Sequence, residues 1–265
     1  MNLYKSKKLS DAESFGKELI MKYQKVDFLY NLLGLILMDQ KKIDEAIEFY
    51  EKGLKIKKDN ATIYNNLGTA YKHKQNYDIA ENYYKRSIRI DNKIPEAQNN
   101  LGNLYSFLNK HKDAISCYKN AININPNFFI SHYNLGVAYK ATGKFSEAKK
   151  HLVESVKLNP HFHPGHRTLS QIAKYKKEDL HFAELKKIYN DSKIRDIEKT
   201  EIAFALGKAS DDIHDFDGAY KYYAKGNELR RKNISFSISN EKREFENIKK
   251  IFKYDIYKDK ITSKL

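Results

Sequence analysis

Several residue types are scarce in this chain, and each scarcity excludes a class of structure. There is one cysteine, Cys117, so no intrachain disulfide can form. Proline (4) and glycine (11) are few among 265 residues, which favours an all-helical chain. No apolar run approaches the roughly 18 residues that a membrane span needs. Because Met1 to Lys8 are polar and basic with no apolar segment behind them, we expect no secretory signal and a cytoplasmic protein.

The sequence also lacks the motifs of common active sites. It has no Gly-rich phosphate loop and no nucleophile elbow. His161, His163 and His166 lie close together, but no Cys, Asp or Glu lies among them. A metal site needs three or four converging ligands. We therefore predict no enzymatic activity, no cofactor and no metal.

The net charge of +15 could suit nucleic acid or an anionic membrane surface, but its distribution does not favour either. Only seven of the 49 basic residues are arginine, and the lysines are spread along the whole chain. Nucleic-acid footprints gather charge on one face. We expect no membrane partner. Association with RNA is kept as the weakest alternative, and it predicts binding that falls steeply with salt.

A four-residue motif recurs with a period of 34 residues. Asn-Asn-Leu-Gly occurs at 65–68 and 99–102, and Tyr-Asn-Leu-Gly occurs at 133–136. A constant period of this length indicates a repeat architecture, in which each repeat is one supersecondary unit stacked on the next. Function is then expected on a repeated surface and not in a single catalytic pocket.

Within each repeat, numbered from position 1 to 34, the apolar pattern predicts two facing helices. Positions 4, 7, 8 and 11 fall on one stripe of a first helix, and positions 20 and 24 on one stripe of a second. Small residues at positions 8 and 20 allow the two helices to approach closely. Pro126 and Pro160 at position 32 end the second helix. Pro95 begins the next first helix, at a place where a missing N–H is tolerated.

This pattern resembles the tetratricopeptide repeat (TPR), which shares its period and its Leu-Gly, Tyr, Ala, aromatic and Pro positions. The resemblance implies an all-α, right-handed superhelical solenoid of helix–turn–helix repeats with capping helices. We expect an N-terminal capping helix (half a repeat) at 1–26, four repeats at 27–162 (27–60, 61–94, 95–128 and 129–162), a degenerate fifth repeat at 163–189, a linker at 190–199, a sixth TPR-like repeat at 200–233, and a C-terminal capping helix and tail at 234–265.

Asparagine recurs at positions 5 and 6, which the resemblance implies should line a concave groove formed by the first helices. An amide side chain carries both donors and an acceptor, so a row of them can hold the backbone of an extended peptide whatever its sequence. Asparagine is a poor helix former, and its recurrence in one helical register therefore favours a binding role. The position-6 row is similar to that of the repeat domain of O-linked N-acetylglucosamine transferases, where such a ladder holds peptide. The predicted peptide-binding residues are Asn31, Asn65, Asn66, Thr69, Asn99, Asn100, Asn103, Tyr133 and Asn134.

Three stretches of the second half look like the repeat region of bacterial TPR-sulfotransferases: 166–170, 204–208 and 226–231. This second resemblance implies an accessory, substrate-presenting region that is inactive without a sulfotransferase catalytic domain. The Pro-Arg-Ser-Gly-Thr-type loop that holds the phosphosulfate donor in those proteins does not occur in this chain. Two alternatives thus stay open: a stand-alone scaffold that binds a protein or peptide, and the accessory region of a sulfotransferase.

Overall fold

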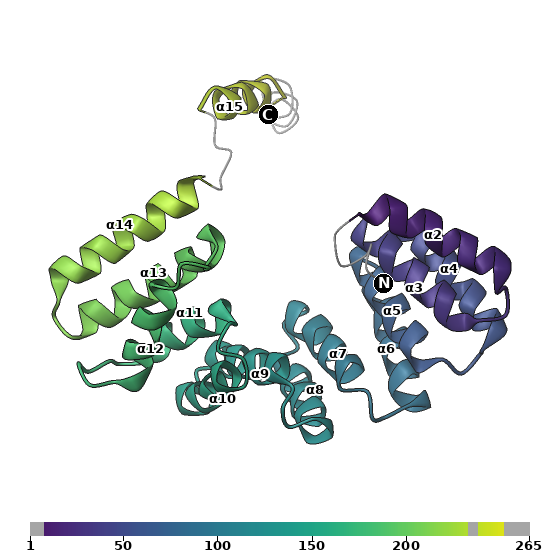
Figure 1. Cartoon of the computed structure of the whole chain (residues 1–265), viewed down its shortest axis with the longest axis horizontal. Helices are drawn as coiled ribbons and strands as arrows, with labels where there is room; N and C mark the ends of the chain where they lie inside the picture. Colours follow the sequence, from purple (N-terminus) through teal and green to yellow (C-terminus); the bar gives the residue numbers. More distant parts are fainter. Residues whose placement is uncertain (1–7, 233–237, 252–265) are drawn as a thin grey trace, which may run out of the picture. The chain divides into compact units, whose positions relative to one another are not determined.

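The computed structural model describes residues 8–232 and 238–251, and every regular element in these ranges is an α-helix (Figure 1). The chain divides into two compact units, residues 1–173 and 174–265, which are described separately. None of the described helices is long and apolar enough to cross a membrane. Predictions made for residues 1–7, 233–237 and 252–265 fall outside the described part of the chain.

The first unit is a series of helical hairpins, and the predicted all-α solenoid of helix–turn–helix repeats is confirmed (Figure 1). The two helices of each hairpin pack tightly together, and each second helix also packs against the first helix of the next hairpin. The first helices of successive hairpins contact one another directly. The helices are α2 (Leu9–Lys22), α3 (Asp27–Asp39), α4 (Ile43–Ile56), α5 (Ala61–His73), α6 (Tyr77–Ile90), α7 (Pro95–Phe107), α8 (His111–Ile124), α9 (Phe129–Ala141), α10 (Phe145–Leu158) and α11 (His163–Ile172).

The two helices of a repeat approach closely because position 8 carries no side chain. A Cβ atom on Gly68 would lie 2.6 Å from Cδ1 of Tyr84, and one on Gly102 would lie 2.6 Å from Cε1 of Tyr118. Both tyrosines, at position 24, are almost completely buried. Leucine at position 7 and alanine at position 20 complete the same layer of the core, with the buried residues Leu33, Leu67, Leu101, Leu135, Ala46, Ala80, Ala114 and Ala148.

In the four repeats at 27–162, each first helix ends in a Schellman motif, in which one residue adopts the left-handed conformation. In the second repeat Gln75 has φ 61°. The N–H of Asn76 donates to the carbonyl of Tyr71 at 2.9 Å, and the N–H of Gln75 donates to that of Lys72 at 3.0 Å. A side chain in this conformation costs about 1–2 kcal/mol, and glycine avoids that cost. The residues at this position are Lys41, Gln75, Asn109 and Gly143.

Replacing Gln75 with glycine should therefore stabilise the protein. We expect Gln75→Gly to raise the free energy of unfolding by about 0.5–1 kcal/mol, because the relief of backbone strain exceeds the added entropy of the unfolded chain. Urea denaturation followed by circular dichroism measures the change. Gly143→Ala is the matched control and should destabilise. A lower free energy of unfolding for Gln75→Gly would show that this turn is not strained.

Aromatic rings fill the space between the two helices of three of the four repeats, on the side away from the asparagine positions. In these repeats the ring at position 23, on the second helix, packs on the ring at position 4, on the first. Tyrosine at position 11 adds a further ring. The contacts, by centroid distance, are Tyr30–Phe49 at 6.4 Å, Tyr64–Tyr83 at 6.0 Å, Tyr71–Tyr83 at 5.3 Å, His132–His151 at 5.4 Å and Tyr139–His151 at 5.8 Å.

His151, in the ring pair of the fourth repeat, is held in its neutral form. Burial, followed by the nearby charges of His132, Lys150 and Lys119, lowers the pKa of His151 to about 4. Nε2 of His132 donates to the carbonyl of Pro126 at 3.0 Å, so Nδ1 of His132 is the acceptor for Nδ1–H of His151 at 3.2 Å. Protonating His151 would add an uncompensated charge to this ring stack.

This packing makes stability depend on pH. The folded-state pKa of His151 lies below the unfolded value of 6.5, so its contribution is complete above pH 6.5 and is lost as the pH falls towards 4. Because His151 is only half-buried, we expect a loss of about 1 kcal/mol. His151→Tyr, which keeps a ring at position 23, should weaken this pH dependence in urea unfolding. Replacing the exposed His161 with glutamine should leave this pH dependence unchanged. If the free energy of unfolding changes with pH equally in His151→Tyr and in the wild-type chain, the assignment of this pH dependence to His151 is wrong.

The second unit contains α12 (Leu180–Tyr189), α13 (Asp196–Asp212), α14 (Phe216–Lys232) and α15 (Ile238–Ile251). The pair α13–α14 repeats the packing of the first unit: a Cβ on Gly207 would lie 2.7 Å from the ring of Tyr223. Ala219 is buried at the position that corresponds to position 20. The sixth hairpin therefore has the same glycine-to-tyrosine contact as the earlier ones.

Helix α13 begins earlier than the sequence predicted. A sixth repeat was expected to start at residue 200 after a linker at 190–199, but the helix starts at Asp196. Glu198 accepts a hydrogen bond from the backbone N–H of Arg195 at 3.1 Å. Carboxylates in a first turn favour a helix N-terminus, so part of the expected linker is helical. The unit boundary at 173/174 lies inside the expected fifth repeat at 163–189, which stays a prediction.

Candidate functional site

The predicted asparagines lie on α3, α5, α7 and α9, and the structure joins them into a ladder between repeats. Each position-6 amide donates to the position-5 oxygen of the preceding repeat. Each rung therefore links two successive first helices with the same geometry. The bonds are Asn66 Nδ2 to Asn31 Oδ1 at 2.7 Å, Asn100 Nδ2 to Asn65 Oδ1 at 3.0 Å, and Asn134 Nδ2 to Asn99 Oδ1 at 2.9 Å.

The two rows of this ladder differ in burial. The position-5 residues are only 5–8% exposed: Asn31, Asn65 and Asn99. The position-6 residues are half-buried: Asn66, Asn100 and Asn134. Buried amides need hydrogen-bond partners, and the position-5 oxygens receive theirs from position 6. The sequence predicted that both rows would face a ligand, but the structure leaves only the position-6 row with substantial exposed surface.

The position-9 residues connect the ladder to the tyrosines of the core. Thr69 Oγ1 lies 3.1 Å from the hydroxyl of Tyr84. Asn103 Oδ1 accepts from the hydroxyl of Tyr118 at 2.9 Å and from Asn134 Nδ2 at 3.0 Å. Burial raises the pKa of Tyr84 to about 12, although its hydrogen bond to Thr69 opposes this, and burial also raises the pKa of Tyr118. Both phenols therefore stay protonated at neutral pH.

The position-6 row retains hydrogen-bonding capacity on its exposed side. Within residues 8–232 and 238–251, no group donates to Oδ1 of Asn100 or of Asn134. Oδ1 of Asn66 lies 3.5 Å from Nδ2 of Asn65, at the limit of a hydrogen bond. An amide oxygen can accept two hydrogen bonds. Half-exposed acceptors thus recur on three successive helices, α5, α7 and α9.

Tyr133 occupies position 5 of the fourth repeat, where the other three repeats have asparagine. It is half-buried, its ring packs edge-on against Phe162 at 4.9 Å, and its hydroxyl lies 3.4 Å from Oγ1 of Thr168. At the other end, Leu32 occupies position 6 of the first repeat. The position-5 series of amides therefore ends at an aromatic side chain, and the position-6 series begins after an apolar one.

Two lysines at position 12 extend this surface and were not among the predicted residues. Lys72 and Lys140 are half-buried, two repeats apart. Burial lowers the pKa of Lys72, and no described carboxylate forms an ion pair with it. Lys140 donates to Oε1 of Gln171. The sequence signal was present, because at 100° per residue position 12 lies on the same side of the first helix as position 5.

The histidines near residue 163 have structural partners in the fold. His163 and His166 are buried while His161 is exposed, and Nε2 of His166 donates to the carbonyl of Pro160 at 2.9 Å.

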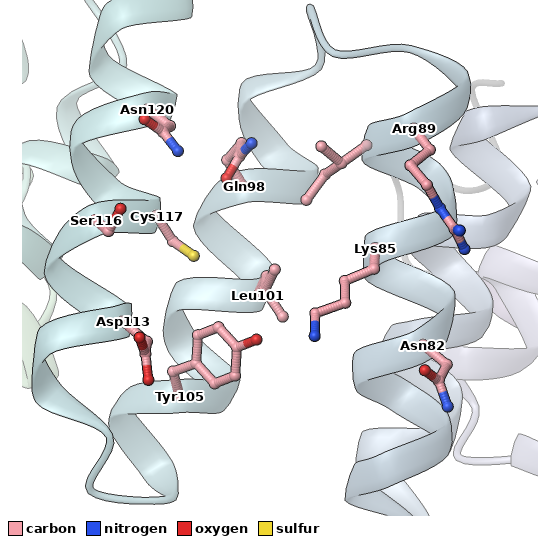
Figure 2. Close-up of a pocket in the computed structure, with 11 residues that line it drawn as sticks. Asn82, Lys85, Arg89, Gln98, Leu101, Tyr105, Asp113, Ser116, Cys117 and Asn120 are labelled. Carbon is pink, nitrogen blue, oxygen red and sulfur yellow. The ribbon is translucent and has the colours of Figure 1, made fainter.

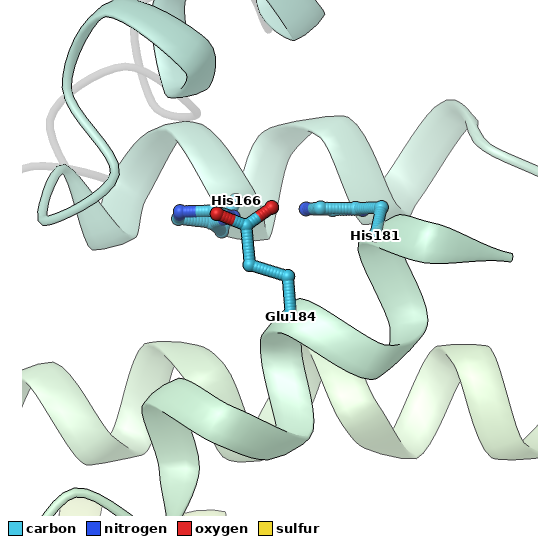
Figure 3. Close-up of side chains that lie close together, drawn as sticks. All are labelled: His166, His181 and Glu184. Atoms are coloured by element: carbon cyan, nitrogen blue, oxygen red, sulfur yellow. The ribbon is translucent and has the colours of Figure 1, made fainter.

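In the second unit, His181 and Glu184 project from the same side of α12 (Figure 3). Nδ1 of His181 lies 2.7 Å from the hydroxyl of Tyr175, whose ring it stacks on. Burial raises the pKa of Glu184.

Comparisons with known proteins agree with this architecture. A family model described as tetratricopeptide repeat matches residues 26–93 and 59–127, and a second model with the same description matches residues 129–162. Together these matches cover just over half of the chain. No match to the chain was found among curated proteins.

Solved structures with the same fold have low sequence identity to this chain. Pseudomonas aeruginosa pilF is 17% identical with a TM-score of 0.61, covering 83% of this chain and 97% of that one. The C-terminal part of a TPR repeat-containing protein from Cytophaga hutchinsonii is 16% identical with a TM-score of 0.59, covering 86% and 92%. At this identity the likeness establishes the fold alone. The matched repeats establish that the chain belongs to the tetratricopeptide repeat family.

Proposed function

We propose that the chain is a protein-binding scaffold that holds an extended peptide segment along the first-helix face. This name denotes the surface of α5, α7 and α9 that carries Asn66, Asn100 and Asn134. The observation that supports it is the row of half-exposed amide oxygens on these helices, two of which have no donor within the described residues. Backbone N–H groups of a peptide are donors that recur regardless of sequence, and they match such a row.

The spacing of the row suits one backbone conformation. Packed helices lie about 8–10 Å apart. A polyproline-II segment has three residues per turn and rises about 3.1 Å per residue, so equivalent N–H groups recur about every 9 Å on one side. A bound segment in this conformation would present one donor per repeat to Asn66, Asn100 and Asn134. A β-strand rises about 3.4 Å per residue with a two-residue period and would fall out of register.

The neighbouring side chains favour an acidic segment. Lys72 is half-buried, and the same burial that lowers its pKa leaves its charge poorly solvated. A ligand carboxylate near Lys72 would restore a partner for this charge. The chain's net charge of +15 adds long-range attraction for such a ligand. The accessory role in a sulfotransferase and the RNA-associated role stay predictions, because the helical-repeat fold does not distinguish either of them from a peptide-binding scaffold.

Removing the exposed amides tests the proposal. Peptides are selected from a random-sequence phage library on the wild-type chain and then titrated against a variant with Asn66, Asn100 and Asn134 changed to alanine. Loss of three hydrogen bonds, each contributing about 0.5–1.5 kcal/mol, should weaken binding at least tenfold. The control variant changes the exposed Asn92, Asn123 and Asn227 to alanine and should bind like the wild-type chain.

Circular dichroism and the urea midpoint of each variant separate a binding effect from unfolding, because position 6 also supports the ladder. A folded triple variant with unchanged affinity for the selected peptides would refute the proposal. So would a library from which the wild-type chain selects no peptide.

A further inference from the structure

The third repeat lacks the ring pair that the other three repeats have between their two helices. Gln98 occupies position 4 and Cys117 occupies position 23, where the other repeats have aromatic rings. A cavity of about 610 Å³ opens at this place, within the size range of ligand pockets. We call it the third-repeat cavity. Its presence follows from two small departures from the pattern of the other repeats.

The cavity lies between α6, α7 and α8 (Figure 2). Its lining residues from α7 are at positions 4, 7 and 11, on the opposite side of that helix from Asn100. Helix α7 contributes Leu101 and Tyr105, and α8 contributes Cys117. Helix α6 contributes Lys85 and Arg89 from the opposite wall. The surface is therefore apolar and aromatic in the middle and cationic on one side.

Tyr105 lacks the ring contact that its counterparts have. At the same position 11, Tyr71 and Tyr139 each stack on the ring at position 23 of their own repeat. No described aromatic ring stacks on Tyr105, whose hydroxyl donates to Glu81 Oε1 at 2.9 Å. In the second and fourth repeats the ring at position 23 fills the space beside this tyrosine, so an aromatic ring is the group that matches the cavity at Cys117.

The charges at the cavity favour an acidic residue next to the aromatic residue of the ligand. Lys85 is paired with Glu81 at 2.6 Å, whereas no described carboxylate pairs with the exposed Arg89. On the other wall Asp113 would repel an acid. A ligand carboxylate is therefore favoured on the α6 side, beside Arg89, while the ring points towards α8.

We propose that the third-repeat cavity binds an aromatic side chain of a partner protein segment, with an adjacent Asp or Glu of that segment pairing with Arg89. The site is separate from the first-helix face and does not depend on the peptide proposed to lie there. Three repeats of the same chain support the choice of an aromatic ring, and Arg89, which no carboxylate of the described residues pairs with, supports the choice of an acidic neighbour.

The test uses soluble Gly/Ser peptides with a central Glu-Tyr-Glu, Glu-Leu-Glu or Gln-Tyr-Gln sequence, titrated by fluorescence anisotropy. Replacing the peptide tyrosine with leucine removes the ring stack, worth about 0.5–1.5 kcal/mol beyond area, and should weaken binding up to about tenfold. Arg89→Gln should weaken the Glu-Tyr-Glu peptide by about twofold to fivefold and leave the Gln-Tyr-Gln peptide unchanged.

Cys117 supplies a readout at the site, because it is the sole cysteine and lines the cavity. Burial raises the pKa of its thiol to about 11, so labelling by a thiol reagent is followed at a fixed alkaline pH. Saturating Glu-Tyr-Glu peptide should slow this labelling in the wild-type chain, and the Glu-Leu-Glu peptide should protect far less. Unaltered labelling with bound peptide would place the ligand elsewhere and overturn the proposal.

Filling the cavity from within should abolish binding. Cys117→Phe restores the ring that Phe49 provides in the first repeat, and Gln98→Tyr fills the same space from α7 if the first variant does not fold. Either folded variant should no longer bind the Glu-Tyr-Glu peptide. The variant with Asn66, Asn100 and Asn134 changed to alanine should still bind it. Binding that survives both fillings, or equal affinity for the tyrosine and leucine peptides, would contradict the proposal.

Discussion

The contact between a glycine of the first helix and a tyrosine ring of the second determines the rest of this structure. Gly34, Gly68 and Gly102 each lie where a Cβ would come within 2.2–2.6 Å of the position-24 ring. Only glycine permits this approach, so each hairpin has nearly the same geometry. Because the geometry repeats, side chains at a given position align from one hairpin to the next, and the ladder of asparagines is a consequence of that alignment.

The ladder combines a structural role with the binding role proposed above, in neighbouring residues. Asn65 and Asn99 are buried and accept hydrogen bonds from the following repeat, which ties successive hairpins together. Asn100 and Asn134 supply those bonds, and within the described residues no group donates to their side-chain oxygens. In a solenoid, stability depends on contacts between neighbouring repeats, so a ladder across these interfaces couples stability to the surface proposed for binding.

The 34-residue period was enough to predict the helical hairpins and the glycine–tyrosine contact, because both depend on residues within one repeat. The period alone did not predict that the position-5 asparagines are buried and the position-6 asparagines half-buried. A single helix viewed alone places both on the same side, whereas the following first helix covers position 5. The third-repeat cavity could have been found by noticing Gln98 and Cys117 among aromatic positions. The start of α13 at Asp196 depended on capping by Glu198, which a mixed-charge run does not reveal.

The most direct test of this account is the response of individual side-chain amides to peptide in solution. Nitrogen-15 NMR resolves asparagine Nδ2 resonances, and peptides selected on the wild-type chain would be titrated while these are observed. We expect saturable shifts at Asn66, Asn100 and Asn134, with the exposed Asn92 and Asn123 unaffected. Shifts confined to residues of α4, α6, α8 and α10, with the three ladder amides unchanged, would contradict the claim that the aligned first helices form the binding surface.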